Sequence, residues 1–510
     1  MHKSILLFLS LALHLLSGAS ASAELMVPAI FSDHMVLQRE MPVPVWGKAA
    51  PGEKVTVTFK GQAVTADAGK DGRWMATLQA MRADANPAKM EIVSASGKLT
   101  LTNILVGEVW LCSGQSNMQL RFLDLKEVPK NVREEIYPDI RLFYVAMKGS
   151  GYPQDQLEYK WCVCDPTAPP VASPLVVNHS VVGYYFIREL FKELKVPVGL
   201  IQSAHGGSGI EAWTPALGFQ DSPNPELNKR VSEIKKAHEE YRDKVKAYLE
   251  AFQTWFDSPD LSAGFAASIP VHPLASYQRV TGLYNGMIAP VVRYAIRGVI
   301  WYQGESNTND GLLYADMMKA MVDGWRKIWS EGDFPFYFVQ IAPYKGYPRL
   351  PELWTAQYQA AKEIKNCGMV SAVDVTDIDD CHPQNKEPVG RRLARMALKK
   401  TYGRTDIQCE SPGYRSMEIT GDKIRVSFDN VSEGGLCSRD GKPPNWFEIA
   451  AQDGAFKKAE AVIDGKTVIV SSPLVPKPAS VRFAWNYIAE PNLSDKDGLP
   501  VLPFDEGGNH

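Results

Sequence analysis

The fold is decided by residues 107–120, which read GEVWLCSGQSNMQL. The first part, residues 107–113, is a short and mostly apolar run, and polar residues and glycine follow it. The same order returns at residues 297–307, RGVIWYQGESN, where an apolar run again ends in a polar loop. Short runs that are apolar on both sides are typical of strands buried on both faces of a parallel sheet. The stretch therefore predicts an α/β fold.

The middle of the chain keeps this rhythm, because helical stretches separate the apolar runs. We expect strands at 107–113, 140–146, 197–203, 297–303, 334–341 and 369–375. We expect helices at 184–194, 225–256, 312–329, 352–365 and 387–402. The stretch 225–256 is highly charged, so a coiled coil or an interaction arm is an alternative to the solvated helix that we predict. The alternation of strands and helices predicts a parallel sheet covered on two faces.

The strand pattern changes on either side of this region. Residues 24–105 contain near-alternating runs such as KVTVTF, separated by Pro-Gly and Gly-Lys-Asp-Gly turns, which predicts an N-terminal β-sandwich-like domain. Alternation returns in residues 406–510, which we expect to form a C-terminal β module. Residues 106–405 are the α/β domain between them.

Length and charge exclude several classes of protein. A chain of 510 residues is too long for one small binding module. Its 55 Lys and Arg residues nearly balance its 58 Asp and Glu residues, so the formal net charge is -3. Such a balance offers no electrostatic attraction for nucleic acid or an anionic membrane surface. We expect no nucleic-acid partner.

The N-terminus has the features of a cleavable signal peptide. Residues 1–23 begin with a basic pair, continue with an apolar run and end in Ala21-Ser22-Ala23, which fits an A-x-A cleavage site. The apolar run is too short to span a bilayer, and no later run reaches about 18 apolar residues. We therefore expect a secreted or periplasmic protein without a membrane span, and an uncleaved N-terminal anchor is the alternative.

The seven cysteines cannot all pair within one chain, because their number is odd. An exported protein permits disulfides, but a chain of this length builds a core without them. We expect mostly buried thiols with one or two bridges at most. The cysteines are Cys112, Cys162, Cys164, Cys367, Cys381, Cys409 and Cys437.

Four polar loops directly follow predicted strands, and ligands of α/β folds bind beyond that edge of the sheet. A serine on a strand-to-helix turn lies beside backbone N–H groups that can hold an oxyanion, and a glycine loop lets further N–H groups approach. A late histidine with a neighbouring carboxylate can accept the serine proton. The loops therefore predict a serine hydrolase. They are 113–118 (SGQSNM), 204–209 (AHGGSG), 303–307 (QGESN) and 377–383 (DIDDCHP).

The G-x-S-x-G elbow of α/β-hydrolases is absent around Ser116. The chain instead resembles the SGNH hydrolase superfamily, and more closely its sialate O-acetylesterase-like carbohydrate esterases. The resemblance covers nearly the whole mature chain and implies a flavodoxin-like SGNH core. The motifs that carry it are GEVWLCSGQSNMQL (107–120), GGSGIEAW (206–213), IWYQGESN (300–307), CHPQNKEPVGRRLA (381–394) and GLPVLPF (498–504).

The resemblance implies a role for each matching residue. Ser116 is expected to be the nucleophile and His382 the general base. The oxyanion hole would comprise the backbone N–H groups of Ser116 and Gly207 and the side chain of Gln303. The superfamily pattern places the orienting acid at Asp379.

The orienting acid has alternatives. Many relatives read Asp-Ile-His-Pro, which would favour Asp380, and here Cys381 stands where they have isoleucine. If neither aspartate orients the base, a backbone carbonyl, Asp374 or Asp377 remains.

Other polar residues of the loops have less demanding interpretations. Ser113 is expected to end its strand, and Ser208 lies in a loop whose task is backbone donation. Asn117 and Glu305 are expected to hold the loops together by hydrogen bonds, and His205 to bond within its own loop. Trp213 and Trp301 are expected to be core or pocket wall rather than sugar-stacking platforms.

The predicted function is that of an exported serine esterase that removes O-acetyl groups from carbohydrates, with O-acetylated sialic acids as the leading substrate. Acetylxylan or another plant glycan is the alternative substrate. A non-catalytic glycan-binding protein is the alternative of a different class. No metal-ligand spacing and no cofactor motif stand in the sequence, so neither a metal nor a cofactor is expected. The expected partner is an O-acetylated glycan or free sugar.

Overall fold

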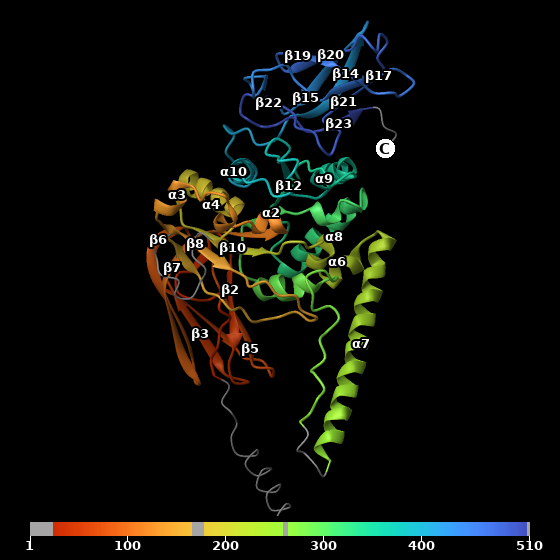
Figure 1. Ribbon diagram of the computed structural model, residues 1–510. Helices are drawn as coiled ribbons and strands as arrows, with labels where there is room; N and C mark the ends of the chain where they lie inside the picture. Colours follow the sequence, from red (N-terminus) through yellow and green to blue (C-terminus); the bar gives the residue numbers. More distant parts are fainter. Residues whose placement is uncertain (1–23, 166–177, 259–263, 507–510) are drawn as a thin grey trace, which may run out of the picture.

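The computed structural model describes residues 24–165, 178–258 and 264–506, and the predicted signal peptide lies outside them. The first strands lie at one end of the molecule, an α/β region lies in the middle, and the last strands lie at the other end (Figure 1). The protein is thus a mixed α/β fold with additional β-rich regions.

One long strand, β7 (Gly97–Gly114), passes through two of these regions. Its first half pairs antiparallel with β6 (Asp84–Ser94), and its side chains alternate in exposure. Its second half pairs in parallel with β10 (Val198–Ala204) and β11 (Gly298–Tyr302) and is buried throughout. A strand changes from alternating to continuous burial where it passes from a sheet with a solvent face to one covered on both faces. β7 therefore crosses the boundary that the sequence placed between residues 105 and 106.

The central sheet has the strand order β13-β12-β11-β7-β10-β8-β9. Neighbours from β13 to β8 are parallel, as predicted, and β9 is antiparallel at the edge. Numbered along the chain, the six parallel strands lie in the order 2-3-1-4-5-6, from β8 at one side to β13 at the other. The strands not yet given are β8 (Tyr137–Tyr144), β9 (Cys162–Cys164), β12 (Phe336–Gln340) and β13 (Cys367–Ser371).

This order makes the end of β7 the topological switch point of the sheet. The chain leaves β7 toward β8 and β10 on one side and returns to β11 on the other. The loops that follow β7, β10 and β11 therefore diverge at one edge. Open α/β sheets bind their ligands in the crevice at such a point.

Helices cover this sheet, and Figure 1 shows β12 between α10 and α9. Both helices contact β12 and β13, and α4 packs on α10 and on β10. Each of these helices ends within a few residues of the predicted bounds. The helices are α4 (Val181–Leu194), α8 (Leu313–Trp329), α9 (Leu350–Glu363) and α10 (Glu387–Lys400), with the shorter α2 (Ser116–Gln119), α3 (Lys130–Glu134), α5 (Ile210–Trp213) and α6 (Ala216–Asp221).

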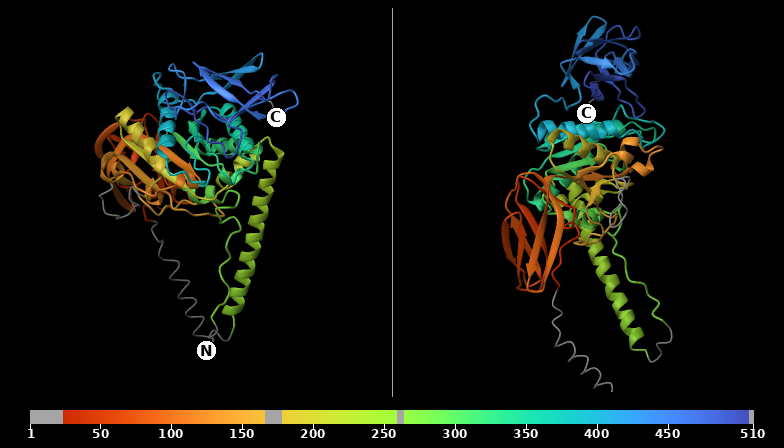
Figure 2. Two further views of the ribbon diagram at one scale, coloured as in Figure 1. Left: turned by 45° about the horizontal axis from the view of Figure 1, so that its top comes forward. Right: turned by 90° about the vertical axis from the view of Figure 1, so that its left-hand side faces the viewer.

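The charged stretch forms one helix, α7 (Pro225–Phe256), with the predicted bounds. Asn224 caps it by accepting a hydrogen bond from the backbone N–H of Glu226, and Pro225 occupies the first turn, where no N–H is needed. Its buried residues, Leu227, Ile234 and Ala237, lie in its first half. The rest of the helix projects from the body of the molecule (Figure 2), which agrees with the prediction of a solvated helix.

The two β-rich ends differ in how they join the middle. The N-terminal strands share one hydrophobic core with the central sheet. These strands are β1 (Val36–Gln38), β2 (Val43–Lys48), β3 (Lys54–Phe59), β4 (Gln62–Asp67), β5 (Arg73–Leu78) and β6.

The C-terminal strands enclose a second core of their own. They are β14 (Gly413–Thr420), β15 (Lys423–Asp429), β16 (Leu436–Ser438), β17 (Phe447–Ala450), β18 (Lys457–Lys458), β19 (Glu460–Asp464), β20 (Thr467–Ser471), β21 (Ser480–Phe483), β22 (Leu493–Asp495) and β23 (Phe504–Glu506).

A buried carboxylate joins the N-terminal strands to the central sheet. Glu108 on β7 is fully buried and accepts hydrogen bonds from the guanidinium groups of Arg39 and Arg297. The Arg297 bond measures 2.8 Å, and the amide of Gln38 donates a further bond of 3.1 Å. A buried charge is stable only when it is paired and hydrogen-bonded, and Glu108 meets both conditions.

The seven cysteines are all free thiols, so the bridges that the sequence left open do not form. Cys112, Cys164, Cys367 and Cys409 are buried, which agrees with the prediction of mostly buried thiols. Among the described residues, no helix has both the length and the apolar character that crossing a membrane requires.

Candidate active site

Ser116 stands at the start of α2, directly after β7. Gly114 ends β7 with φ of 140°, and a Cβ there would lie 2.2 Å from the carbonyl oxygen of Tyr302 on β11. Only glycine permits this approach of the two strands together with this backbone angle. The sequence Ser113-Gly114-Gln115 thus turns the chain sharply at the switch point and presents the hydroxyl of Ser116 there.

The structure brings Ser116 and His382 together, as the sequence predicted. The Oγ atom of Ser116 lies 2.8 Å from Nε2 of His382, although 266 residues separate the two in the chain. His382 lies on the loop between β13 and α10. Burial lowers the pKa of His382 below its ordinary value of 6.5, and the positive charge of Lys386 lowers it further, while Asp380 opposes both. The imidazole is therefore neutral near pH 7 and can accept the serine proton.

The two candidate acids point in different directions. Asp379 accepts a hydrogen bond of 2.7 Å from the ammonium of Lys345, and its side chain is 73% exposed. Asp380 accepts a 2.8 Å hydrogen bond from the backbone N–H of His382, and its Oδ1 lies 3.9 Å from Nδ1 of that imidazole. The structure therefore brings Asp380 to the base, and not Asp379 as expected.

A tight turn is the reason for this difference. The N–H of Asp380 donates to the carbonyl of Asp377, and the N–H of Asp379 donates to the carboxylate of Asp377. This turn directs Asp379 toward solvent. The more distant candidate Asp374 is occupied by Arg392, which donates two hydrogen bonds of 2.6 and 2.7 Å to it.

Cys381 stands between the acid and the base. Its Sγ lies 3.5 Å from Nδ1 of His382. Burial raises the pKa of the Cys381 thiol, so the sulfur is protonated and uncharged near pH 7. The thiol is therefore a weak hydrogen-bonding neighbour of the imidazole rather than a second nucleophile.

Two of the three predicted oxyanion donors are available. Neither the N–H of Ser116 nor that of Gly207 has a hydrogen-bond acceptor among the described residues. Gly207 has a φ of 69°, which glycine adopts without strain. The neighbouring N–H of Gly206 is held by the amide oxygen of Gln119 at 2.6 Å, so α2 fixes this loop beside Ser116.

The third predicted donor is engaged elsewhere. Gln303 is fully buried, and its amide nitrogen donates to the carbonyl of Ser208 at 3.2 Å and to Oδ1 of Asn307 at 2.6 Å. Its amide oxygen accepts a hydrogen bond from the hydroxyl of Tyr314. An amide nitrogen has two hydrogens, and both are used here. Gln303 therefore supports the loop of Ser208 and does not present a donor to Ser116.

The other loop residues lie as the sequence predicted. Asn117 and Glu305 are buried and bond to each other, which holds the loops after β7 and β11 together. His205 contacts the carbonyl of its neighbour Gly206 at 2.9 Å. Trp213 and Trp301 are fully buried core residues.

The two alternative serines are also accounted for. Ser113 is buried on β7, and Ser208 donates to the carbonyl of His205. Neither is placed as a nucleophile.

One residue of the site was missed at the level of sequence. Lys386 is the N-cap residue before α10, is 1% exposed, and donates a hydrogen bond to Oδ1 of Asn117. It is part of the motif CHPQNKEPVGRRLA, but a lysine in a polar loop is usually exposed, so its burial gave no signal.

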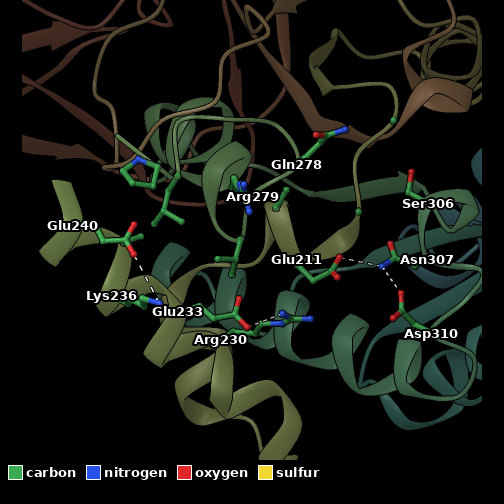
Figure 3. A pocket seen from close by; sticks show the side chains of 17 residues that line it. Glu211, Arg230, Glu233, Lys236, Glu240, Gln278, Arg279, Ser306, Asn307 and Asp310 are labelled. Atoms are coloured by element: carbon green, nitrogen blue, oxygen red, sulfur yellow. Dashed lines mark hydrogen bonds and ion pairs between the residues drawn. The ribbon is translucent and has the colours of Figure 1, made fainter. Parts of the chain in front are cut away.

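A cavity of about 680 Å³ opens beside the glycine loop (Figure 3). Gly207, Ser306 and Asn307 line it from the sheet edge, and α7 lines it from the other side. Ser116 and His382 are not among its lining residues, so the cavity adjoins this pair rather than containing it.

The charged side chains of the cavity are mostly paired. Arg230 and Glu233 lie 2.8 Å apart, and Lys236 and Glu240 lie 3.9 Å apart. Glu211 and Asp310 accept hydrogen bonds from the amide of Asn307. Arg279 forms no ion pair and no side-chain hydrogen bond with any described residue. The cavity thus offers one unpaired cation to a ligand.

Within the described residues, one group gathers three potential metal-binding atoms. Asp380, Cys381 and His382 hold such atoms within 4.8 Å of one another. Nε2 of His382 is already bonded to Ser116. The group lies on the loop that carries His382.

The family model for carbohydrate esterases described as sialic acid-specific acetylesterase (SASA) matches residues 106–256 and 270–399, more than half of the chain. The sialate O-acetylesterase of Rattus norvegicus is 28% identical, over 89% of this chain and 88% of its own length. The human sialate O-acetylesterase is 27% identical, over 99% of this chain and 98% of its own length. A crystal structure of a carbohydrate acetylesterase from Xanthomonas citri is 30% identical and superposes with a TM-score of 0.78, covering 94% of this chain and 99% of that one. With these matches and a serine–histidine pair at the switch point of its sheet, the chain belongs to the sialic acid-specific acetylesterase family of carbohydrate esterases.

Proposed function

We propose that this carbohydrate esterase hydrolyses O-acetyl esters of sialic acids with Ser116 as nucleophile and His382 as general base. The observation that carries the mechanism is the 2.8 Å contact between Ser116 Oγ and His382 Nε2 at the switch point of an α/β sheet. A non-catalytic glycan-binding protein would have no use for this contact. Five of the six parallel strands, β7 and β10 to β13, lie in the order 2-1-3-4-5 of flavodoxin-like sheets, which supports an SGNH-type core.

The first half of the reaction forms an acyl-enzyme. Ser116 Oγ attacks the acetyl carbonyl carbon while its proton passes to Nε2 of His382. The carbonyl oxygen becomes an oxyanion, which the backbone N–H groups of Ser116 and Gly207 stabilise. The tetrahedral intermediate then collapses, the bond to the sugar oxygen breaks, and His382 returns the proton to that oxygen. The deacetylated sugar leaves.

The second half releases acetate. His382 removes a proton from a water molecule, whose oxygen attacks the acetyl group on Ser116. The second tetrahedral intermediate uses the same two N–H donors. It expels Ser116 Oγ, which regains its proton from His382, and acetic acid leaves as acetate.

Asp380 is the acid that we propose for orienting His382, in place of Asp379. Its carboxylate accepts a hydrogen bond from the backbone N–H of His382 and lies 3.9 Å from Nδ1, so it is the acidic group beside this nitrogen. A charged acceptor on this side keeps the Nδ1–H tautomer and leaves Nε2 for the serine.

The choice of sialic acids rests on the relatives and on the cavity. Sialic acids carry a carboxylate, and the unpaired guanidinium of Arg279 is a suitable partner for one. Acetylated plant glycans remain the alternative, because the similar Xanthomonas citri enzyme is described only as a carbohydrate acetylesterase. These neutral sugars would not need Arg279.

A substrate panel tests this function. Acetate release is measured with O-acetylated sialic acids and with acetylated xylo-oligosaccharides, for the wild type, Ser116→Ala and Arg279→Ala. We expect Ser116→Ala to lose nearly all activity, with Ser113→Ala as the control that keeps it. We expect Arg279→Ala to raise KM for the acidic sugar alone. Wild-type turnover in Ser116→Ala would overturn the mechanism, and a preference for acetylated xylo-oligosaccharides would overturn the choice of substrate.

We also propose that the protein is exported, on the strength of the signal-peptide pattern at residues 1–23. N-terminal sequencing of the protein from the secreted or periplasmic fraction tests this. A mature chain that begins at Glu24 is expected.

A further inference from the structure

One buried amide joins the nucleophile's turn to the base's loop. Asn117 follows Ser116 in the chain, and its Nδ2 donates a 2.9 Å hydrogen bond to the carbonyl of Cys381, the residue before His382. The amide is 2% exposed, so no water competes for this bond. A second contact therefore accompanies the one between Ser116 and His382, and it joins the residue after Ser116 to the residue before His382.

Two buried groups of opposite charge flank this amide. Glu305, on the loop after β11, accepts a hydrogen bond from Asn117 Nδ2 at 2.5 Å. Lys386, at the start of α10, donates one to Asn117 Oδ1, also at 2.5 Å. Glu305 is 8% exposed and Lys386 is 1% exposed. The second carboxylate oxygen of Glu305 is buried and has no hydrogen-bond partner among the described residues.

We propose that Lys386 and Glu305 are positioning residues that fix the amide of Asn117 in one orientation, and thereby set the distance between Ser116 and His382. The inference rests on the proposed function, because it assigns these two residues to the serine–histidine mechanism. Neither residue touches the reacting atoms.

The chemistry of the three side chains allows one arrangement only. An ammonium group only donates hydrogen bonds, and a carboxylate only accepts them. A flipped amide would direct its NH₂ group at Lys386 and its oxygen at both Glu305 and the carbonyl of Cys381. That arrangement would lose every bond of the buried cluster and leave its charges unpaired, which is costly in a low-dielectric interior.

Lys386 also acts on the base electrostatically. The titratable groups that face His382 are Asp380, Cys381 and Lys386, and those that face Lys386 in turn are Glu305, Asp380 and Cys381. Burial lowers the pKa of Lys386 to about 7, so the ammonium becomes fully charged as the pH falls below that value. Its charge disfavours a second positive charge on the imidazole.

The experiment compares two variants with the wild type. Lys386→Met combined with Glu305→Gln removes both buried charges together, which avoids an unpaired charge and preserves folding. Asn117→Ala removes the amide that joins the two loops and keeps the charged groups of Lys386 and Glu305. Lys345→Met is the matched control. It also removes a lysine near the loop of His382, but this lysine is exposed and pairs with Asp379. Thermal unfolding is followed for every variant.

Two readouts separate this proposal from the proposed function. Acetate release gives kcat and KM as a function of pH. The rate of covalent labelling by a fluorophosphonate reports the reactivity of Ser116 without any sugar substrate. If the wild type reacts with the fluorophosphonate but releases no acetate, the proposed function is contradicted. The labelling rates of the variants then still test the positioning role.

The expected results are specific. Asn117→Ala lowers kcat and the labelling rate by roughly 10²-fold at constant KM, since a misplacement of about 1 Å has effects of that size. The double variant lowers both rates and moves the acidic limb of the pH profile to higher pH. The control changes neither. If the double variant unfolds at the wild-type temperature with an unshifted pH profile and rates within about 2-fold of wild type, the proposal is overturned.

Discussion

The carboxylate of Asp380 holds the backbone N–H of His382 at 2.8 Å, and its Oδ1 lies 3.9 Å from Nδ1 of the same residue. One aspartate thus accepts a hydrogen bond from the main chain of His382 and lies beside its imidazole ring. Its neighbour Asp379 turns away to Lys345.

From this geometry we predict that Asp380→Asn lowers kcat strongly, by up to about 10⁴-fold, because loss of the orienting acid permits the wrong imidazole tautomer. Asp379→Asn is the matched control. It breaks an exposed ion pair and should leave kcat close to that of the wild type. Steady-state kinetics of acetate release measure both. Inactivity of Asp379→Asn with normal turnover of Asp380→Asn would restore the assignment expected from the sequence.

The pH dependence follows from the lowered pKa of His382. Burial and then Lys386 place this pKa below the ordinary value of 6.5. The base must be neutral, so activity is lost as pH falls through this pKa and is full above it. We predict that the acidic limb of kcat/KM has its midpoint below pH 6.5, measured with a substrate that carries no titrating group. A midpoint above 6.5 would show that the carboxylate of Asp380 outweighs burial.

The buried ion pair between the N-terminal strands and the central sheet gives a stability prediction. Glu108→Ala removes the buried carboxylate that the guanidinium groups of Arg39 and Arg297 share. Breaking a buried pair in this way destabilises a protein by about 3–5 kcal/mol. Chemical denaturation measures it.

The control for this change is Glu40→Ala. The Glu40 side chain is 57% exposed and lies 3.8 Å from Arg39 and 3.7 Å from Arg297. The Glu40→Ala substitution should change the free energy of unfolding by less than about 1 kcal/mol. Equal effects of the two substitutions would contradict a structural role for burial at Glu108.

Metal independence is the last prediction. Asp380, Cys381 and His382 hold potential ligand atoms close together, but Ser116 already occupies Nε2 of the histidine. We expect dialysis against EDTA to leave acetate release unchanged. A complete loss that zinc restores would show that this group is a metal site.

Local sequence patterns were enough for much of the fold. The apolar runs around residues 107–113 and 297–303 identified strands, because burial on both faces of a parallel sheet leaves a continuous apolar signature. The charged stretch 225–256 identified α7 with its bounds, since helix periodicity and capping residues are local properties. The strand predicted at residues 107–113 is the second half of a longer strand, β7, because an alternating first half and a buried second half look like two separate strands.

The motifs also predicted that Ser116 and His382 would meet, and that Asn117 and Glu305 would hold loops together, and both contacts are present. These assignments depend on the type of each residue and on its place after a strand. They need no knowledge of how far apart the loops lie in space.

Other features were decided by the tertiary structure. Asp379 and Asp380 are identical side chains in adjacent positions, and only the turn at Asp377 determines which of them faces the base. Gln303 has the right chemistry for an oxyanion donor, but Ser208 and Asn307, which packing brings to it, use both of its hydrogens.

Lys386 is the clearest example of a feature that the sequence could not predict. The sequence by itself predicted the strands, the helices and the pairing of Ser116 with His382, because these follow from short-range patterns and residue chemistry. It could not determine that a lysine in a polar loop would be buried against Asn117, since burial depends on which distant segments meet. Direction, pairing and burial of polar groups arise only when the loops after β7, β11 and β13 converge at one edge of the sheet.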